Sequence, residues 1–193
     1  MAKMRFVFAT GSKQRRQLFA KTGFVAKFIA MNVREKSKGD PRKLVAQNAH
    51  AKAIAAQKRF PSCACIGADT LVWQKNGRSR GWKVFGKPKG TKDAKRMLDA
   101  FNGKMHFVGT GIAILNGGKC VEFCEISKVY FKTLEEKQIL GYIKTNEWKN
   151  KAGSYALQGK GRRLISKIKG SRDNVIGLPA KELAKRLRRM QKA

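Results

Sequence analysis

Asp69 is the residue whose position in this sequence most clearly suggests chemistry. It follows the apolar run Cys63–Ile66 within the segment Gly67-Ala68-Asp69-Thr70, so it lies where the apolar part of a predicted strand ends. Acidic residues are scarce in the chain, which has 12 Asp and Glu against 44 Lys and Arg and a formal net charge of +32. A carboxylate among so many cations can hold a metal ion or accept a proton from water.

A second candidate site lies near the N-terminus, where the sequence predicts an anion-binding turn. Ser12 ends the turn Thr10-Gly11-Ser12, and a helix is predicted to begin at Lys13. Such a turn offers a hydroxyl group, backbone N–H groups and the positive end of a helix dipole to a phosphate. Arg15 and Arg16 lie in the first turn of that helix, and a guanidinium group matches phosphate oxygens in pairs. A solvated row of cations is the alternative interpretation in a chain this basic.

Strands and helices alternate along the predicted chain. The predicted strands are Met4–Ala9, Phe24–Ala30, Cys63–Trp73, Met105–Leu115, Cys120–Phe131 and Leu164–Ile168. The predicted helices are Lys13–Lys21, Arg42–Arg59, Thr91–Phe101, Leu134–Lys144 and Glu182–Met190. Turn residues at 76–81 and 116–118 indicate two hairpins. We therefore expect a mixed α/β fold with a central β-sheet flanked by helices.

The composition is that of one globular protein. With 193 residues, 42% of them hydrophobic, the chain can close one core, so we expect a single domain over residues 1–193 with a smaller lobe. No apolar run approaches the roughly 20 residues of a membrane span, and the start lacks a signal-peptide pattern. We therefore expect a cytoplasmic protein with no membrane partner. The charge favours anionic partners, but it is spread along the chain and does not choose among them.

The four cysteines suggest a reducing compartment and not a disulfide framework. Cys63 and Cys65 form one pair in the sequence, and Cys120 and Cys124 form another. The spacings C-x-C and C-x3-C are unusual for a zinc site, so we interpret these thiols as buried strand side chains. The two histidines, His50 and His106, are isolated in the sequence and are interpreted as structural or surface residues.

Seven motifs, taken in their order and spacing, resemble the Maf family over about residues 4–190. The motifs are Thr10-Gly11-Ser12-x-x-Arg15-Arg16, Glu35, Lys52, Gly67-Ala68-Asp69-Thr70, Gly86-Lys87-Pro88, the run KAGSYALQG at 151–159 and the run NVIGLP at 174–179. The resemblance implies a fold similar to that of Maf proteins and inosine triphosphatases. It also implies a pyrophosphatase that cleaves a nucleoside triphosphate between the α and β phosphates, with a divalent metal ion.

The resemblance implies a role for each matching residue. The phosphate-contacting positions of the family are matched by Ser12, Arg15, Arg16, Lys52 and Lys87. Asp69 matches the proposed proton acceptor, and together with Glu35 it is expected to bind Mg²⁺ or Mn²⁺. These assignments agree with the chemistry, because a triphosphate needs cations around it and a carboxylate to activate water or hold metal.

Base choice in the family resembles a code of three positions, matched here by Gln14, Thr70 and Gln158. The family division that prefers dTTP and UTP has Arg, Thr and Gln, and the division that acts on 7-methyl-GTP has Trp, Gln and Glu. Two of the three residues here agree with the first division, so dTTP and UTP are the expected substrates. The spacing of the first motif resembles the second division.

Two departures from the family pattern remove negative charge near the expected site. Arg34 and Asn150 stand where many members have Asp, and an inward-pointing Arg34 would compete with a metal ion for Glu35.

The alternative function is therefore a catalytically impaired protein of the same fold that binds nucleic acid or polyphosphate through its cationic surface. An inosine-triphosphatase-like enzyme is a more distant alternative. A homodimer, and a natural or a deliberately recharged origin of the surface, also stay open.

Overall fold

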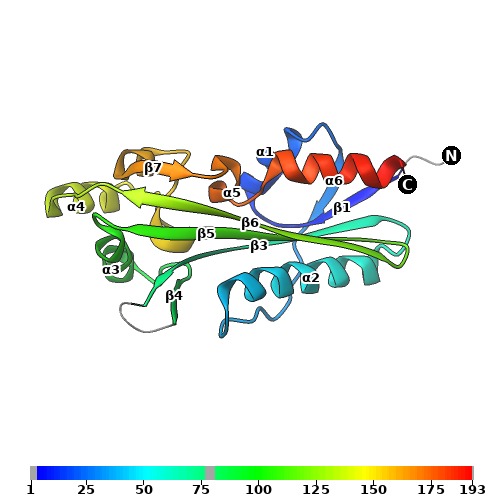
Figure 1. Ribbon diagram of the computed structural model, residues 1–193, viewed down its shortest axis with the longest axis horizontal. Coiled ribbons are helices and arrows are strands. Elements are labelled where there is room, and N and C mark those ends of the chain that lie inside the picture. Colours follow the sequence, from blue (N-terminus) through cyan, green and yellow to red (C-terminus); the bar gives the residue numbers. More distant parts are fainter. Residues whose placement is uncertain (1–3, 77–80, 193) are drawn as a thin grey trace. The chain divides into compact units, whose positions relative to one another are not determined.

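The computed structural model describes residues 4–76 and 81–192 (Figure 1). Its strands are β1 (Phe6–Ala9), β2 (Ala26–Ile29), β3 (Ala64–Lys75), β4 (Trp82–Phe85), β5 (Met105–Asn116), β6 (Lys119–Phe131) and β7 (Ile165–Lys169). Its α-helices are α1 (Lys13–Ala20), α2 (Pro41–Arg59), α3 (Thr91–Phe101), α4 (Glu136–Lys144), α5 (Arg172–Ile176) and α6 (Ala180–Lys192), with 3-10 turns at Ala152–Ser154 and Lys160–Leu164.

The strands form a mixed sheet in the order β2-β1-β3-β5-β6-β7, with β4 paired to β3. The pairs β1–β2 and β1–β3 are parallel, whereas β3–β4 and β6–β7 are antiparallel. The expected mixed α/β fold is therefore confirmed. None of the described helices is long and apolar enough to span a membrane.

The chain divides into two compact units. The first unit comprises Met1–Thr70, Thr110–Glu125 and Gly177–Ala193, and the second comprises Leu71–Gly109 and Ile126–Ile176. The first contains β1, β2, α1, α2 and α6, and the second contains β4, α3, α4, α5 and β7. The long strands β3, β5 and β6 contribute residues to both units, so the chain passes between the units within these strands.

The first unit is built on the parallel strands, whose central member β1 is buried along its whole length. Phe8 of β1, Phe19 of α1 and Phe28 of β2 pack together, with ring centroids 5.5–6.1 Å apart. Helices α2 and α6 lie on opposite sides of the strands of this unit (Figure 1). These contacts explain the continuous apolar run of β1, because a strand covered on both faces has no polar side.

Helix α2 packs on the sheet of the first unit through two glycines. A Cβ atom added to Gly67 of β3 would overlap the backbone of Ala49 and would lie 2.7 Å from Ala53 N. A Cβ atom on Gly111 of β5 would overlap the backbone of Val45 in the same way. The missing side chains let the helix approach both strands closely.

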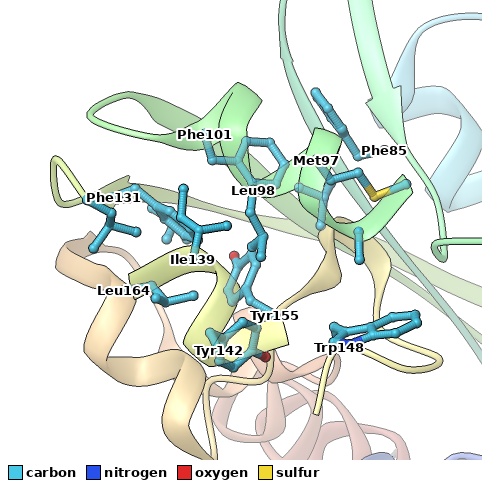
Figure 2. Close-up of a cluster of buried hydrophobic side chains, with 14 of the residues drawn as sticks. Phe85, Met97, Leu98, Phe101, Phe131, Ile139, Tyr142, Trp148, Tyr155 and Leu164 are labelled. Carbon is cyan, nitrogen blue, oxygen red and sulfur yellow. The ribbon is translucent and has the colours of Figure 1, made fainter. Parts of the chain in front are cut away.

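The second unit has a core of aromatic and aliphatic side chains, shown in Figure 2. Phe101 of α3 lies at the centre of four aromatic contacts, and its ring stacks on His106 of β5 at 4.1 Å between centroids. His106 is fully buried, and its Nε2 lies 2.8 Å from the hydroxyl of Tyr155. Burial lowers the pKa of His106 to about 3, because the imidazolium form would lose its hydration.

The structure differs from the predicted elements in several places. Strand β4 and the short helix α5 were not predicted, since β4 (WKVF) lacks the continuous apolar run of β1 and the five residues of α5 span little more than one helical turn. The predicted hairpin at 76–81 is confirmed by the antiparallel pairing of Lys75 in β3 with Trp82 in β4, although residues 77–80 lie outside the described residues. The expectation of buried strand thiols is correct for Cys65 and wrong for Cys120 and Cys124, which are exposed. Their even spacing along β6 places both on one face, and that face also carries the exposed Glu122.

Candidate active site

The carboxylate of Asp69 is buried in the first unit and has a partner for each oxygen. Lys52 Nζ lies 2.8 Å from Oδ1, and Asn48 Nδ2 donates to Oδ2 at 3.0 Å. The Asp69 residue is only 5% exposed and Lys52 is 9% exposed. Pairing at this depth stabilises the charges, because either group alone would be buried without compensation. Asp69 is therefore held in one orientation by two side chains of α2.

Glu35 joins the same cluster from the segment between β2 and α2. Its Oε1 lies 2.6 Å from Lys52 Nζ, and its side chain is 53% exposed. The ammonium group of Lys52 therefore lies between two carboxylates, one buried and one open to solvent. Arg34 is exposed, and the cation that pairs with Glu35 is Lys52.

Asn48 holds the segment that carries Glu35 in place through hydrogen bonds to its backbone. Its amide group accepts from the backbone N–H of Lys36 at 2.8 Å and donates to the carbonyl oxygen of Lys36 at 3.1 Å. The same amide nitrogen donates to Asp69, and Asn48 is 2% exposed. One buried side chain thus links the acidic residue of β3 to the loop residue beside Glu35.

The local sequence explains why α2 can present these side chains. Asp40 caps the helix by accepting from the N–H groups of Arg42 and Lys43, and Pro41 occupies its first turn. Asn48 and Lys52 are four residues apart, so they lie on one face of the helix. Gly67 allows that face to reach Asp69, because any side chain at this position would hold α2 away from β3.

The start of α1 forms the turn predicted from the sequence. Ser12 is its N-cap, and the hydroxyl oxygen accepts from the backbone N–H of Arg15 at 3.3 Å. The hydroxyl also donates to Gln14 Oε1 at 3.3 Å. Arg16 is exposed, with its guanidinium carbon 5.5 Å from the ring centre of Phe28.

Arg15 has a second set of contacts within the first unit. Its Nε donates to the carbonyl oxygen of Gly177 at 2.9 Å, and its Nη2 donates to Thr70 Oγ1 at 2.9 Å. Thr70 Oγ1 also lies 2.9 Å from Thr110 Oγ1. Burial lowers the pKa of Arg15, and the nearby carboxylates of Asp69 and Glu35 oppose that effect. Arg15 therefore links α1 to the middle of β3, which continues beyond Thr70 to Lys75, and to the segment that precedes α6.

Two of the predicted site residues, Lys87 and Gln158, belong to the second unit and are exposed. The loop that carries Lys87 is linked to the 3-10 turn at Ala152–Ser154 by a hydrogen bond from Gly153 N–H to Gly86 O at 3.1 Å. Gly153 has a φ of 72°, a left-handed conformation that favours glycine. Burial lowers the pKa of Lys151, and the positive charge of Lys87 lowers it further.

A family model described as Maf-like protein matches residues 5–190 of the sequence. The chain belongs to the Maf-like family. The matched range includes Asp69, Glu35, Lys52 and the start of α1, so the resemblance inferred from the seven motifs is confirmed.

Several relatives match this Maf-like chain over nearly its whole length. A dTTP/UTP pyrophosphatase of Pyrococcus furiosus is 38% identical over 177 residues, which are 91% of this chain and 90% of that protein. A dTTP/UTP pyrophosphatase of Treponema denticola is 37% identical over 187 residues, covering 92% of each chain. One from Thermoanaerobacter sp. is 38% identical over 190 residues, covering 96% of each chain.

The roles of three residues of this Maf-like protein were not predicted from the sequence. Asn48 and Thr110 contact predicted site residues of the first unit, and Lys151 lies near Lys87 in the second. Asn48 could have been found from its spacing, because it precedes Lys52 by one helical turn. Thr110 gave no signal in the sequence, since it is one threonine within a long apolar strand.

Proposed function

We propose that this Maf-like protein hydrolyses dTTP and UTP to the nucleoside monophosphate and pyrophosphate. The observation that carries the proposal is the buried Asp69 carboxylate, held by Lys52 and Asn48 beside the solvent-exposed Glu35. The dTTP/UTP pyrophosphatases that match this chain over nine-tenths of their length support the same activity. A carboxylate fixed in this way is suited to accept a proton from an attacking water molecule.

A divalent cation fits the donor set of the cluster. Asp69 and Glu35 lie close together, because each pairs with the same ammonium nitrogen of Lys52, and an ion bound between the two carboxylates would take the place of that nitrogen. Carboxylate oxygens are the ligands that Mg²⁺ and Mn²⁺ prefer, so Asp69 and Glu35 are the residues that would hold the ion. Such an ion, when bound, would supply positive charge beside the phosphate oxygens.

The remaining residues of the cluster have positioning roles. Lys52 holds Asp69 and Glu35 together and supplies positive charge toward the triphosphate. Asn48 orients Asp69 and fixes the backbone next to Glu35. Because all four side chains belong to the first unit, this part of the site is complete within one unit.

Each unit carries residues that match the phosphate and base contacts of the family. Ser12, Arg15, Arg16 and Lys87 are proposed phosphate contacts that are open to solvent at least in part, whereas Lys52 is buried. Arg15 would act on the phosphates and also fix Thr70, to which it donates a hydrogen bond. Gln14, Thr70 and Gln158 would contact the base, and the amide of Gln158 can both donate and accept hydrogen bonds.

The direct test is pyrophosphate release from a panel of triphosphates with Mg²⁺ or Mn²⁺. We expect turnover with dTTP and UTP, lower turnover with ATP, CTP and 7-methyl-GTP, and loss of turnover when the metal ion is removed with a chelator. Turnover of none of these substrates at saturating metal would refute the proposal. Equal turnover of all five would refute the assignment of the base contacts.

A second activity, binding of nucleic acid, is favoured by the net charge of +32. The phosphate backbone of RNA attracts such a surface without regard to sequence, and the binding weakens steeply with salt. We propose that this association is separable from hydrolysis. Exposed cations of α6 lie on the surface of the first unit, whereas the Asp69 cluster is mostly buried.

A further inference from the structure

Three side chains with different metal-binding atoms meet on the surface of the first unit. His50 Nδ1 lies 2.6 Å from Glu122 Oε1, and Cys120 Sγ lies 3.9 Å from the same nitrogen. All three donor atoms lie within 4.8 Å of one another. His50 is half-buried, whereas Cys120 and Glu122 are exposed, so an ion could reach them from solvent.

The meeting of these side chains follows from how α2 lies along β6. Cys120, Glu122 and Cys124 alternate along the strand and share its exposed face. At one end of this stretch His50 of α2 meets Cys120 and Glu122. At the other end the positive charge of Arg42, near the start of α2, acts on Cys124. The helix and the strand therefore run side by side, and only the Cys120 end carries an imidazole.

The distances suit a tetrahedral zinc site with one position left for water. Zinc bonds of about 2.3 Å to sulfur and about 2.0–2.2 Å to nitrogen and oxygen place neighbouring donor atoms roughly 3.3–3.6 Å apart. The separation of 3.9 Å between Sγ and Nδ1 is close to this range. The His50–Glu122 contact of 2.6 Å would need to widen by roughly 0.7 Å, which an exposed glutamate can do by a rotamer change.

We propose that His50, Cys120 and Glu122 form a binding site for Zn²⁺, separate from the Asp69 cluster. On binding, the Cys120 thiol releases its proton to solvent, the His50 ring gives up the Nδ1 proton and keeps a proton on Nε2 only, and the thiolate, the imidazole Nδ1 and the carboxylate bind the ion. The thiolate and the carboxylate together balance the two charges of the ion. A thiolate ligand selects Zn²⁺ over Mg²⁺, which prefers oxygen ligands. The ion would join α2, which also carries Asn48 and Lys52, to β6.

The test is a titration of the full chain with Co²⁺ and then Zn²⁺, in the presence of a reductant that contains no thiol. Co²⁺ bound to a thiolate gives a charge-transfer band in the near ultraviolet, and Zn²⁺ should displace it. Variants Cys120→Ser and His50→Ala should lose the band and bind Zn²⁺ at least about tenfold more weakly, since even a residue that only orients a ligand costs 10–100-fold. Variant Cys124→Ser is the matched control, because it lies on the same face of β6 and should bind like the wild type.

Two further measurements test whether metal binding at this site is independent of the proposed catalytic site. Asp69→Asn should leave the Co²⁺ band unchanged, and Cys120→Ser should hydrolyse dTTP with Mg²⁺ at the wild-type rate. A band that persists in Cys120→Ser, or that disappears in Cys124→Ser or Asp69→Asn, would overturn the proposal. Absence of a band in the wild type would also overturn it and would leave the His50–Glu122 contact as a hydrogen bond only.

Discussion

The two units bury ionisable side chains in opposite ways. In the first unit, Asp69 and Lys52 are buried as a charged pair, and Asn48 satisfies the second carboxylate oxygen. In the second unit, His106 is buried as a neutral ring against Phe101, with Tyr155 as its hydrogen-bond partner. Among the described residues, His106 Nδ1 has no hydrogen-bond partner. The Asp69–Lys52 pair keeps charged groups available for chemistry, whereas the neutral His106 ring contributes to the packing of the core.

The Asp69 cluster of the first unit and the His106 cluster of the second unit also differ in their exposure to solvent. The polar cluster of the first unit opens to solvent through Glu35, which is 53% exposed. The aromatic cluster of the second unit is closed, and Phe101 and His106 are both 0% exposed. Changes in the first cluster that leave Lys52 paired with Glu35 should therefore affect turnover before stability. Changes in the second should affect stability before turnover.

The largest expected effect is on turnover, from Asp69→Asn. This change keeps the size of the side chain and removes the carboxylate that accepts the proton, so kcat should fall by about 10²–10⁴-fold. The control is Asp99→Asn in α3, which breaks an exposed ion pair with Lys95 and should leave kcat unchanged. Pyrophosphate release at saturating metal measures both. A kcat for Asp69→Asn near that of the wild type would refute the catalytic assignment.

The next effect is on the acid stability of the second unit. The pKa of His106 is lowered from 6.5 to about 3, so between these values the unfolded chain binds a proton that the folded chain does not. Stability is therefore present above pH 6.5 and is lost as the pH falls. His106 alone should lower the free energy of unfolding by roughly 2.5 kcal/mol between pH 6 and pH 4.

Denaturant unfolding at several pH values measures this contribution. The variant His106→Phe combined with Tyr155→Phe removes the titrating ring together with its partner hydroxyl, so no polar group is left unpaired. We expect the double variant to lose less stability than the wild type between pH 6 and pH 4. Equal slopes for the two proteins would show that His106 does not control the acid sensitivity.

A smaller effect is expected on base selectivity from Gln158→Glu. Gln158 is exposed, so the change should not alter stability, but a carboxylate cannot donate the hydrogen bond that an amide donates. The ratio of kcat/KM for UTP to that for 7-methyl-GTP should fall about tenfold, as for one hydrogen bond worth about 1.4 kcal/mol. Gln191→Glu, on the exposed end of α6, adds the same charge as a control. An unchanged ratio would mean that Gln158 does not contact the base.

The smallest effect on hydrolysis is expected from surface charge. Replacing Lys185, Arg188 and Arg189 of α6 by Gln should weaken RNA binding and lower its salt slope by about 2–3, with UTP hydrolysis unchanged. Arg186 is retained, because it pairs with Glu182 and lies over Phe123. Salt titrations of RNA binding, with and without the substitutions, measure the slope.

A matched set of substitutions in the second unit tests whether RNA binding is spread over the whole surface. It consists of Lys92→Gln, Lys104→Gln and Lys132→Gln, three exposed positions. If binding is diffuse, both sets should lower the salt slope equally. Loss of UTP hydrolysis in the folded α6 variant would contradict the separation of surface charge from catalysis.

Local pattern in the sequence was sufficient for most elements and for the central acidic residue. The Ala-rich composition of α2 predicts a helix, and the apolar run before Asp69 predicts a strand, because both are local features of the sequence. Helix α3 was predicted with the bounds that the structure has, Thr91–Phe101. The four-residue strand β4 was missed, since its assignment depends on pairing with β3.

Contacts between distant segments were decided only by the tertiary structure. The sequence identified Lys52 as a cation for phosphate, but its pairing with both Asp69 and Glu35 depends on how closely α2 approaches β3. Gly67 permits that approach through the absence of a side chain, and its letter alone does not tell which backbone will fill the space. The meeting of His50 with Cys120, 70 residues away along the chain, likewise depends on the packing of a helix on a strand. Local spacing determines the faces of an element, whereas packing determines what each face meets.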